Sequence, residues 1–221
     1  MKNLQVDDEF YKKLSKYAVF IPIINIDGKD YILFEVRSDI VSQKGEVSFP
    51  GGGVNEGESF EMAAIRECRE ELNLDEKDVS LKGYSSMILS SSDRIIKAYF
   101  GRINKKFEHI SYNVEVSSIF TVSIDYLKNN PPEKYRAKMI MDLPDDFPFE
   151  KIPNGRDYNF WQRYHTFYFY DTKPVIWGMT AKLLNDFIKY NALKWFLICG
   201  KIKVWDYFIN KRKMWLWKII L

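Results

Sequence analysis

The stretch from Ser59 to Leu72 most constrains what this chain can fold into, because its apolar and acidic residues recur with the period of a helix. At about 100° per residue, the apolar side chains fall on one arc of that helix. Glu67, Glu70 and Glu71 fall on another arc that does not overlap it. We therefore expect a helix, capped by Ser59, that packs on a sheet with one face and gathers three carboxylates on another.

Carboxylates spaced at i, i+3 and i+4 repel one another unless a counter-charge neutralises them. Oxygen ligands in this arrangement suit Mg²⁺ or Mn²⁺, which also take water and phosphate oxygens. The alternative is a solvated acidic helix face that Arg66 and Arg69 stabilise. The helix by itself leaves both interpretations open.

Three consecutive glycines, Gly51 to Gly53, lie between a short strand expected at 47–49 and this helix. Glycine permits backbone angles and close approaches that other residues do not. A glycine loop can therefore aim a carbonyl or amide groups at a metal–phosphate group. A P-loop is excluded because no Gly-Lys-Ser/Thr follows, and a dinucleotide fingerprint is excluded because the G-x-G-x-x-G spacing is absent. The glycines favour the metal site over the solvated face.

The segment from Phe49 to Leu74 resembles the Nudix box, in which a glycine and a glutamate precede Arg-Glu-apolar-x-Glu-Glu-x-Gly-apolar. The positions that match are Gly52, Glu58, Arg66, Glu67, Cys68, Glu70, Glu71 and Leu74. Asn73 stands where the family has glycine. Because asparagine is the next-best residue for a left-handed helix end, we expect the turn to be kept.

Further segments are similar to coenzyme A diphosphatase-type Nudix proteins. They are residues 36–38 (Val-Arg-Ser), 45–52 (Gly-Glu-Val-Ser-Phe-Pro-Gly-Gly), 113–122 and 175–181. With the box, the resemblance covers about residues 17–190. The stretch from Asp39 to Lys44 departs from this group, because it is one residue shorter and lacks the arginine usual there.

The resemblance implies a Nudix-type α/β/α sandwich of the α+β class, with a mixed sheet and a loop–helix–loop catalytic motif. It implies that Mg²⁺ or Mn²⁺ is the cofactor. The implied metal ligands are Glu67 and Glu71, then Glu70 and the Gly51 carbonyl. The implied catalytic groups are Glu70 as a base, Arg66 to orient a box carboxylate such as Glu70, and Glu115 as an alternative base or ligand. Arg37 and Gly52 are the expected substrate contacts, and Glu58 is expected to brace the loop. For Glu115 and Arg37, the alternative is an exposed residue next to a strand.

The implied function is hydrolysis of a diphosphate bond in a nucleotide-containing metabolite. With coenzyme A as substrate, the products are phosphopantetheine and adenosine 3′,5′-bisphosphate. The alternatives are another nucleoside diphosphate-X substrate, or a non-catalytic Nudix-fold binding module. His109 and His165 have no serine or carboxylate partner at a recognisable spacing, so we interpret both as structural or surface residues.

Elsewhere the chain predicts strands with short connections. They are expected at 17–26, 31–36, 84–89, 95–103, 114–124, 135–143 and 165–170. Asp27-Gly28 predicts a tight hairpin turn between the first two. Pro174 is expected to open a late helix that runs to about Tyr190.

Residues 1–190 form the expected domain, and residues 191–221 form a basic, aromatic tail with seven Lys/Arg and one acid. The tail could pack on the domain or pair subunits in a homodimer, contact an anionic membrane, or stack on nucleic acid. No specific nucleic-acid partner is expected. Two cysteines give no disulfide framework. The first residues are too charged to be typical of a signal peptide. The sequence also lacks an apolar stretch long enough to predict a membrane-spanning helix. We therefore expect a cytoplasmic protein.

Overall fold

The computed structural model describes residues 13–90, 93–158, 160 and 163–191. Its centre is a seven-stranded mixed sheet in which β1 (Ser15–Ile26) lies between β2 (Lys29–Arg37) and β6 (Arg94–Ile103). β1 pairs with β2 in antiparallel and with β6 in parallel orientation. The other strands are β3 (Val47–Ser48), β4 (Gly51–Gly53), β5 (Val79–Leu89) and β7 (Val116–Ser123).

The turn between β1 and β2 is the one that the sequence predicts. Asp27 and Gly28 both have positive φ angles, 49° and 79°. Two successive positive φ angles give a turn whose twist matches that of the flanking strands. The hairpin is therefore determined locally, and it sets the register of Ile23 opposite Ile32.

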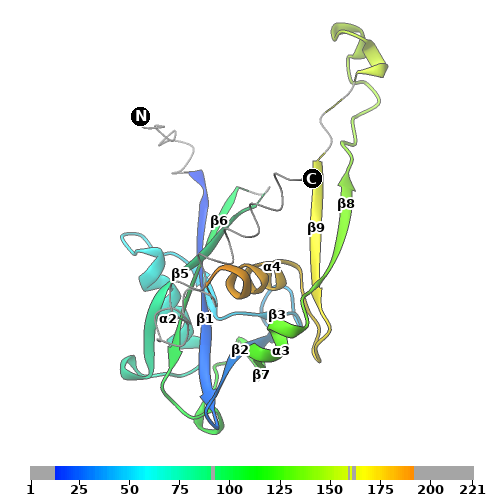
Figure 1. Cartoon of the computed structure of the whole chain (residues 1–221). Coiled ribbons are helices and arrows are strands. Elements are labelled where there is room, and N and C mark those ends of the chain that lie inside the picture. Colours follow the sequence, from blue (N-terminus) through cyan, green and yellow to red (C-terminus); the bar gives the residue numbers. More distant parts are fainter. Residues whose placement is uncertain (1–12, 91–92, 159, 161–162, 192–221) are drawn as a thin grey trace, which may run out of the picture.

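Two helices cover opposite faces of the sheet, as Figure 1 shows: α2 (Phe60–Glu71) and α4 (Gly178–Asp186). β1 contributes side chains to the hydrophobic core on both faces of the sheet, because alternate side chains of a strand point in opposite directions. Its even-numbered residues, such as Phe20, pack with α2, whereas odd-numbered ones, such as Ile21, pack with α4. The expected sandwich and its α+β class are confirmed.

A second, three-stranded sheet has the order β10–β9–β8. It consists of β8 (Glu133–Met139), β9 (Arg163–Tyr170) and β10 (Ile176–Trp177). The β8–β9 hairpin extends as a long arm beside the body of the molecule (Figure 1). Its base is anchored by the buried residues Tyr170 and Ile176, which belong to the core under α4.

The remaining helices are short. They are α3 (Ile124–Asn129), the 3-10 turns η1 (Glu76–Asp78), η2 (Phe107–His109), η3 (Phe149–Lys151) and η4 (Gly155–Asp157), and a π-helical end, η5 (Phe187–Asn191). Within the described ranges, no helix has the length and apolar character needed to cross a bilayer.

The start predicted for the late helix is wrong. The helix begins at Gly178 rather than Pro174, because Ile176 and Trp177 pair with β9 instead. The Thr172 hydroxyl accepts the Ile176 N–H at 3.2 Å and fixes this turn back toward β9. From residue 192 on, the basic aromatic tail lies outside the described residues, so its predicted roles stay predictions.

Candidate functional site

Helix α2 has the boundaries and caps that its sequence predicts. The Ser59 hydroxyl accepts the Met62 N–H at 3.1 Å, and the helix runs from Phe60 to Glu71. Asn73 then adopts φ 46°, which confirms the left-handed end expected at the position where the box has glycine. Residues within a few positions of the helix therefore form the caps at both of its ends.

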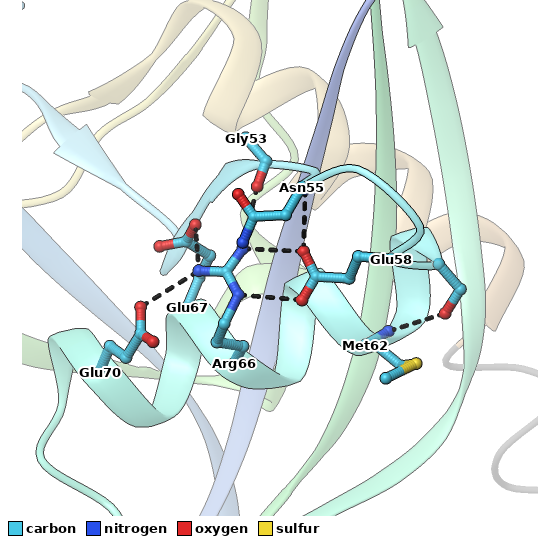
Figure 2. A network of polar contacts seen from close by, with 8 residues as sticks. Gly53, Asn55, Glu58, Met62, Arg66, Glu67 and Glu70 are labelled. Atoms are coloured by element: carbon cyan, nitrogen blue, oxygen red, sulfur yellow. Dashed lines mark hydrogen bonds and ion pairs between the residues drawn. The ribbon is translucent and has the colours of Figure 1, made fainter.

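Arg66 is the centre of a polar network on the exposed side of α2, shown in Figure 2. Its Nε and Nη2 donate to the two oxygens of Glu58, at 2.9 and 3.0 Å. Its Nη1 donates to Glu67 at 2.8 Å and to Glu70 at 3.1 Å, and Nη2 also donates to the Gly53 carbonyl. The predicted pairing of Arg66 with Glu70 is thus present, and one guanidinium fixes three carboxylates of the box.

Glu58 braces the loop before the helix, as predicted. Besides its paired bonds to Arg66, its Oε2 accepts the Asn55 N–H at 3.0 Å. The hydrogen bonds from Arg66 hold the pKa of Glu58 below its usual value. Glu58 therefore ties the loop to α2.

The three glycines form a strand, not the flexible loop that the sequence suggested. They make up β4, which pairs with Tyr17 to Val19 of β1. A Cβ atom on Gly51 would lie 2.5 Å from the Ala18 carbonyl oxygen, and one on Gly52 would lie 2.3 Å from Glu67 Oε1. Gly51 is required because the backbone of β1 approaches it so closely, and any side chain on Gly52 would displace the Glu67 carboxylate from its present position.

Glu71, the last residue of α2, is buried, with 5% of its surface exposed. Its Oε2 accepts the Gly51 N–H at 2.8 Å. Burial, and then the negative charge of Glu35, raise the pKa of Glu71 to about 9, although the Gly51 N–H acts in the opposite direction. Burial likewise raises the pKa of Glu67, against the effect of Arg66.

Glu35, in β2, is an acid of this site that sequence reasoning missed. It is 2% exposed, and its Oε1 accepts a hydrogen bond from the Ser48 hydroxyl at 2.9 Å. Burial raises its pKa to about 7, although Ser48 and Arg37 act in the opposite direction. The available signal was a lone glutamate inside the apolar run of residues 31–36.

A cleft of about 860 Å³ opens over these groups. Its lining includes the predicted residues Arg37, Gly51, Gly52, Arg66, Glu67, Glu70, Glu71 and Glu115. Glu115 is exposed and directly precedes β7, and its charge adds to the raised pKa of Glu71. Arg37 donates to the Ser42 carbonyl oxygen at 2.7 Å, which holds the guanidinium at the cleft. The structure thus brings together predicted groups that are up to 78 positions apart in the chain.

The far wall of the cleft comes from segments that sequence reasoning did not connect with the site. His165 and Phe167 of β9 line it, as do Trp177 and Thr180 near the start of α4. The Thr180 hydroxyl donates to the Val47 carbonyl oxygen at 3.0 Å and ties α4 to β3. His165 is exposed, as expected for a surface residue, but it faces the cleft. His109 is exposed in η2, in line with the same expectation.

The donor set fits a divalent cation by its chemistry. Buried or half-buried carboxylates with raised pKa values bind a cation that replaces the missing counter-charge. Glu35 Oε2 is buried beside them without a hydrogen-bond partner. Among the described residues, no three such side chains already converge on one point, since Glu67 and Glu70 are turned toward Arg66.

Comparison with known proteins agrees with this arrangement. The model of the NUDIX domain family matches residues 14–143. Nudix hydrolase 3 of Caenorhabditis elegans is 31% identical over an alignment of 181 residues that covers 78% of this chain and 71% of that protein. The mouse (Mus musculus) peroxisomal coenzyme A diphosphatase NUDT7 is 30% identical over an alignment of 181 residues that covers 78% of this chain and 70% of that protein. The uncharacterized Nudix hydrolase NudL of Enterobacter sp. (strain 638) is 25% identical over 170 residues, 76% of this chain and 79% of that protein.

Proposed function

This chain belongs to the Nudix hydrolase family and is a hydrolase of diphosphate bonds, and from that premise we propose that its substrate is coenzyme A or a derivative. The observation that carries this proposal is the extent of similarity to the mouse coenzyme A diphosphatase. It spans 78% of the chain and so reaches well beyond the box. Hydrolysis would give phosphopantetheine and adenosine 3′,5′-bisphosphate.

The pocket beside the cleft fits a long substrate that carries an additional arm besides its base and its phosphates. An apolar pocket of about 620 Å³ shares Phe167 and Trp177 with the cleft. Trp177 stacks on Phe169 with ring centroids 5.9 Å apart, and Tyr135 lies edge-on to the same Phe169 ring. A substrate held by its diphosphate over the carboxylates can lay its pantetheine arm along this wall.

Nudix enzymes generally depend on divalent metal ions, and we propose Mg²⁺ or Mn²⁺ here. Glu67, Glu71 and Glu70, with the Gly51 carbonyl, are the groups that would hold the ion. A bound divalent ion neutralises the anionic oxygens of the diphosphate and lowers the pKa of water. These residues supply the hard oxygen donors that such an ion prefers.

The protein's own groups divide the remaining work. The side chain of Glu70 is 57% exposed at the cleft, where it can accept a proton from the attacking water. Arg66 orients Glu67 and Glu70 through its two Nη1 bonds. Glu115, which lines the cleft from the position just before β7, is the alternative base. Arg37 and the Gly52 backbone contact the phosphates.

The experiment that tests the proposal is product analysis over a substrate panel with Mg²⁺ and with Mn²⁺. The panel contains coenzyme A, an acyl thioester of it, a dinucleoside polyphosphate, an ADP-sugar and a modified nucleotide. We expect coenzyme A or its thioester to give the highest kcat/KM, with adenosine 3′,5′-bisphosphate as product. A higher kcat/KM for any other member would replace coenzyme A with that substrate. Absence of cleavage throughout, with either ion, would contradict the enzymatic assignment.

A further inference from the structure

Glu35 is a carboxylate buried in the central sheet. It lies in β2 between β3 and β7, opposite Ser48 on one side and Ile119 on the other. Leu33, two residues earlier and therefore on the same face of the sheet, packs in the core formed with α2. Glu35 thus lies between the sheet and the C-terminal part of α2. Burial, and then the charges of Glu35 and Glu71, raise the pKa of the Cys68 thiol.

The hydrogen bonds of Glu35 are incomplete. Oε1 accepts from Ser48, whereas the buried Oε2 has no hydrogen-bond partner in the structure. Burying a charge without a partner is costly, and a cation or a full set of hydrogen bonds normally offsets the cost. Among charged groups, Arg37 favours the ionised form of Glu35, whereas the acids Glu71, Glu115 and Glu67 oppose it.

Two other buried or partly buried acids, Asp30 and Asp78, are satisfied within the fold. Both oxygens of Asp30 accept from Arg102, at 3.1 and 3.0 Å. Asp78 accepts the Asp75 N–H and lies 4.0 Å from the Lys105 ammonium. Glu35 is more deeply buried than Asp78, yet its second oxygen is left open beside other carboxylates. This contrast indicates that its counter-charge comes from outside the chain.

We propose that Glu35 is an inner acid of the divalent-cation site, contributed by β2, whose negative charge strengthens binding of the ion held by Glu67 and Glu71. The inference rests on the proposed function, because it requires a cation at the box. Glu35 acts here through its charge, which adds to that of the buried Glu71 carboxylate. It is therefore a positioning residue of the site.

Calorimetric titration of the whole protein with Mn²⁺ at pH 8 tests the inference without relying on turnover. Glu35→Gln keeps an acceptor for Ser48 but removes the charge. We expect its Kd for Mn²⁺ to rise about tenfold, the lower end of the range for groups that support metal ligands. The thermal midpoint of the metal-free variant should stay equal or rise, since an unpaired buried carboxylate is removed. Asp78→Asn, which neutralises a buried acid away from the cleft, should leave the Kd unchanged.

A second neutral variant, Glu35→Met, controls for any effect that is specific to the glutamine side chain. It should show the same loss of affinity for Mn²⁺. If Glu35→Gln folds and binds Mn²⁺ as tightly as the wild type, the role of Glu35 is refuted. A lower thermal midpoint of both metal-free Glu35 variants with unchanged Kd would refute it as well and assign a scaffold role. If the wild-type protein itself binds no Mn²⁺, or if Glu71→Gln binds it equally well, the proposed metal site fails instead.

Discussion

The amide nitrogen of Gly51 lies 2.8 Å from Oε2 of Glu71 and donates a hydrogen bond to it. This contact joins the glycine strand β4 to the last residue of α2, two segments that approach the cleft from different directions. It orients the buried carboxylate and partly compensates its charge. The geometry of the site therefore depends on a backbone group as well as on the box glutamates.

Replacing Glu71 with glutamine should nearly abolish turnover while the fold is kept. Glutamine can still accept the Gly51 N–H, but it cannot supply the negative charge that a divalent ion needs. We expect kcat/KM to fall by more than about 100-fold, the upper end for residues that only support a metal ligand. Steady-state kinetics measures the loss, and circular dichroism with a thermal melt checks the fold. A rate close to the wild type would refute the role of Glu71.

Replacing either of two adjacent glycines, Gly52 or Gly53, with alanine should change the catalytic rate to different extents. In Gly52→Ala the new Cβ would lie 2.3 Å from Glu67 Oε1, so the carboxylate must move. Because a displacement of this size at a catalytic group can cost about 100-fold in rate, we expect a loss of 10- to 100-fold, roughly. Gly53→Ala is the matched control, since its Cβ meets nothing within 4 Å. Equal kinetics for the two variants would show that the position of Glu67 does not matter.

Arg66→Lys should be a severe change despite the retained charge. A lysine cannot reproduce the paired bonds to Glu58 together with those to Glu67, Glu70 and the Gly53 carbonyl. We expect urea denaturation to show a loss of about 1.5–3 kcal/mol in the free energy of unfolding, the range for hydrogen bonds to charged groups. Arg69→Lys, on the same helix, serves as the control because the Arg69 Nε makes no hydrogen bond in the structure. A stability loss at Arg69 as large as that at Arg66 would argue against the network.

The left-handed residue after α2 predicts a difference between two small side chains. Asn73 has φ 46°, so Asn73→Gly relieves backbone strain and Asn73→Ala does not. Both lose the 3.3 Å contact to the Ser111 hydroxyl, so comparing them isolates the backbone effect. We expect the alanine variant to be less stable than the glycine variant by about 1 kcal/mol. Equal unfolding midpoints would show that the helix end tolerates another conformation.

The buried acids predict how the stability of the metal-free protein depends on pH. The pKa of Glu71 rises from 4.5 to about 9 on folding, so its protonated form is favoured in the folded state. The contribution of the Glu71 carboxyl to the free energy of unfolding is fully present below about pH 4.5 and is lost as the pH rises toward 9. In EDTA, the wild type should therefore lose stability relative to Glu71→Gln between pH 5.5 and about 8.5, by at least about 1 kcal/mol. A constant difference in urea midpoint across these pH values would contradict the raised pKa.

Much of the site's local structure could be predicted from neighbouring residues alone. Periodicity located α2, Ser59 marked its start, and Asn73 marked its end, because caps and helix faces depend on residues within a turn or two of one another. The separation of the acidic arc from the apolar arc follows for the same reason. The late helix was placed too early because Ile176 and Trp177 pair with β9, a contact that periodicity cannot show.

The sequence by itself determined the carboxylate-bearing helix, its caps, the Asp27-Gly28 turn and the family, since each depends on short-range spacing. The tertiary structure alone decided that the glycines pair with β1, that Glu35 is buried where its charge acts on Glu71, and that β9 and α4 form the far wall of the cleft. The physical reason is that burial, close approach and the repulsion between charges are set by residues distant in the chain. These contacts form only when the strands have paired into the sheet.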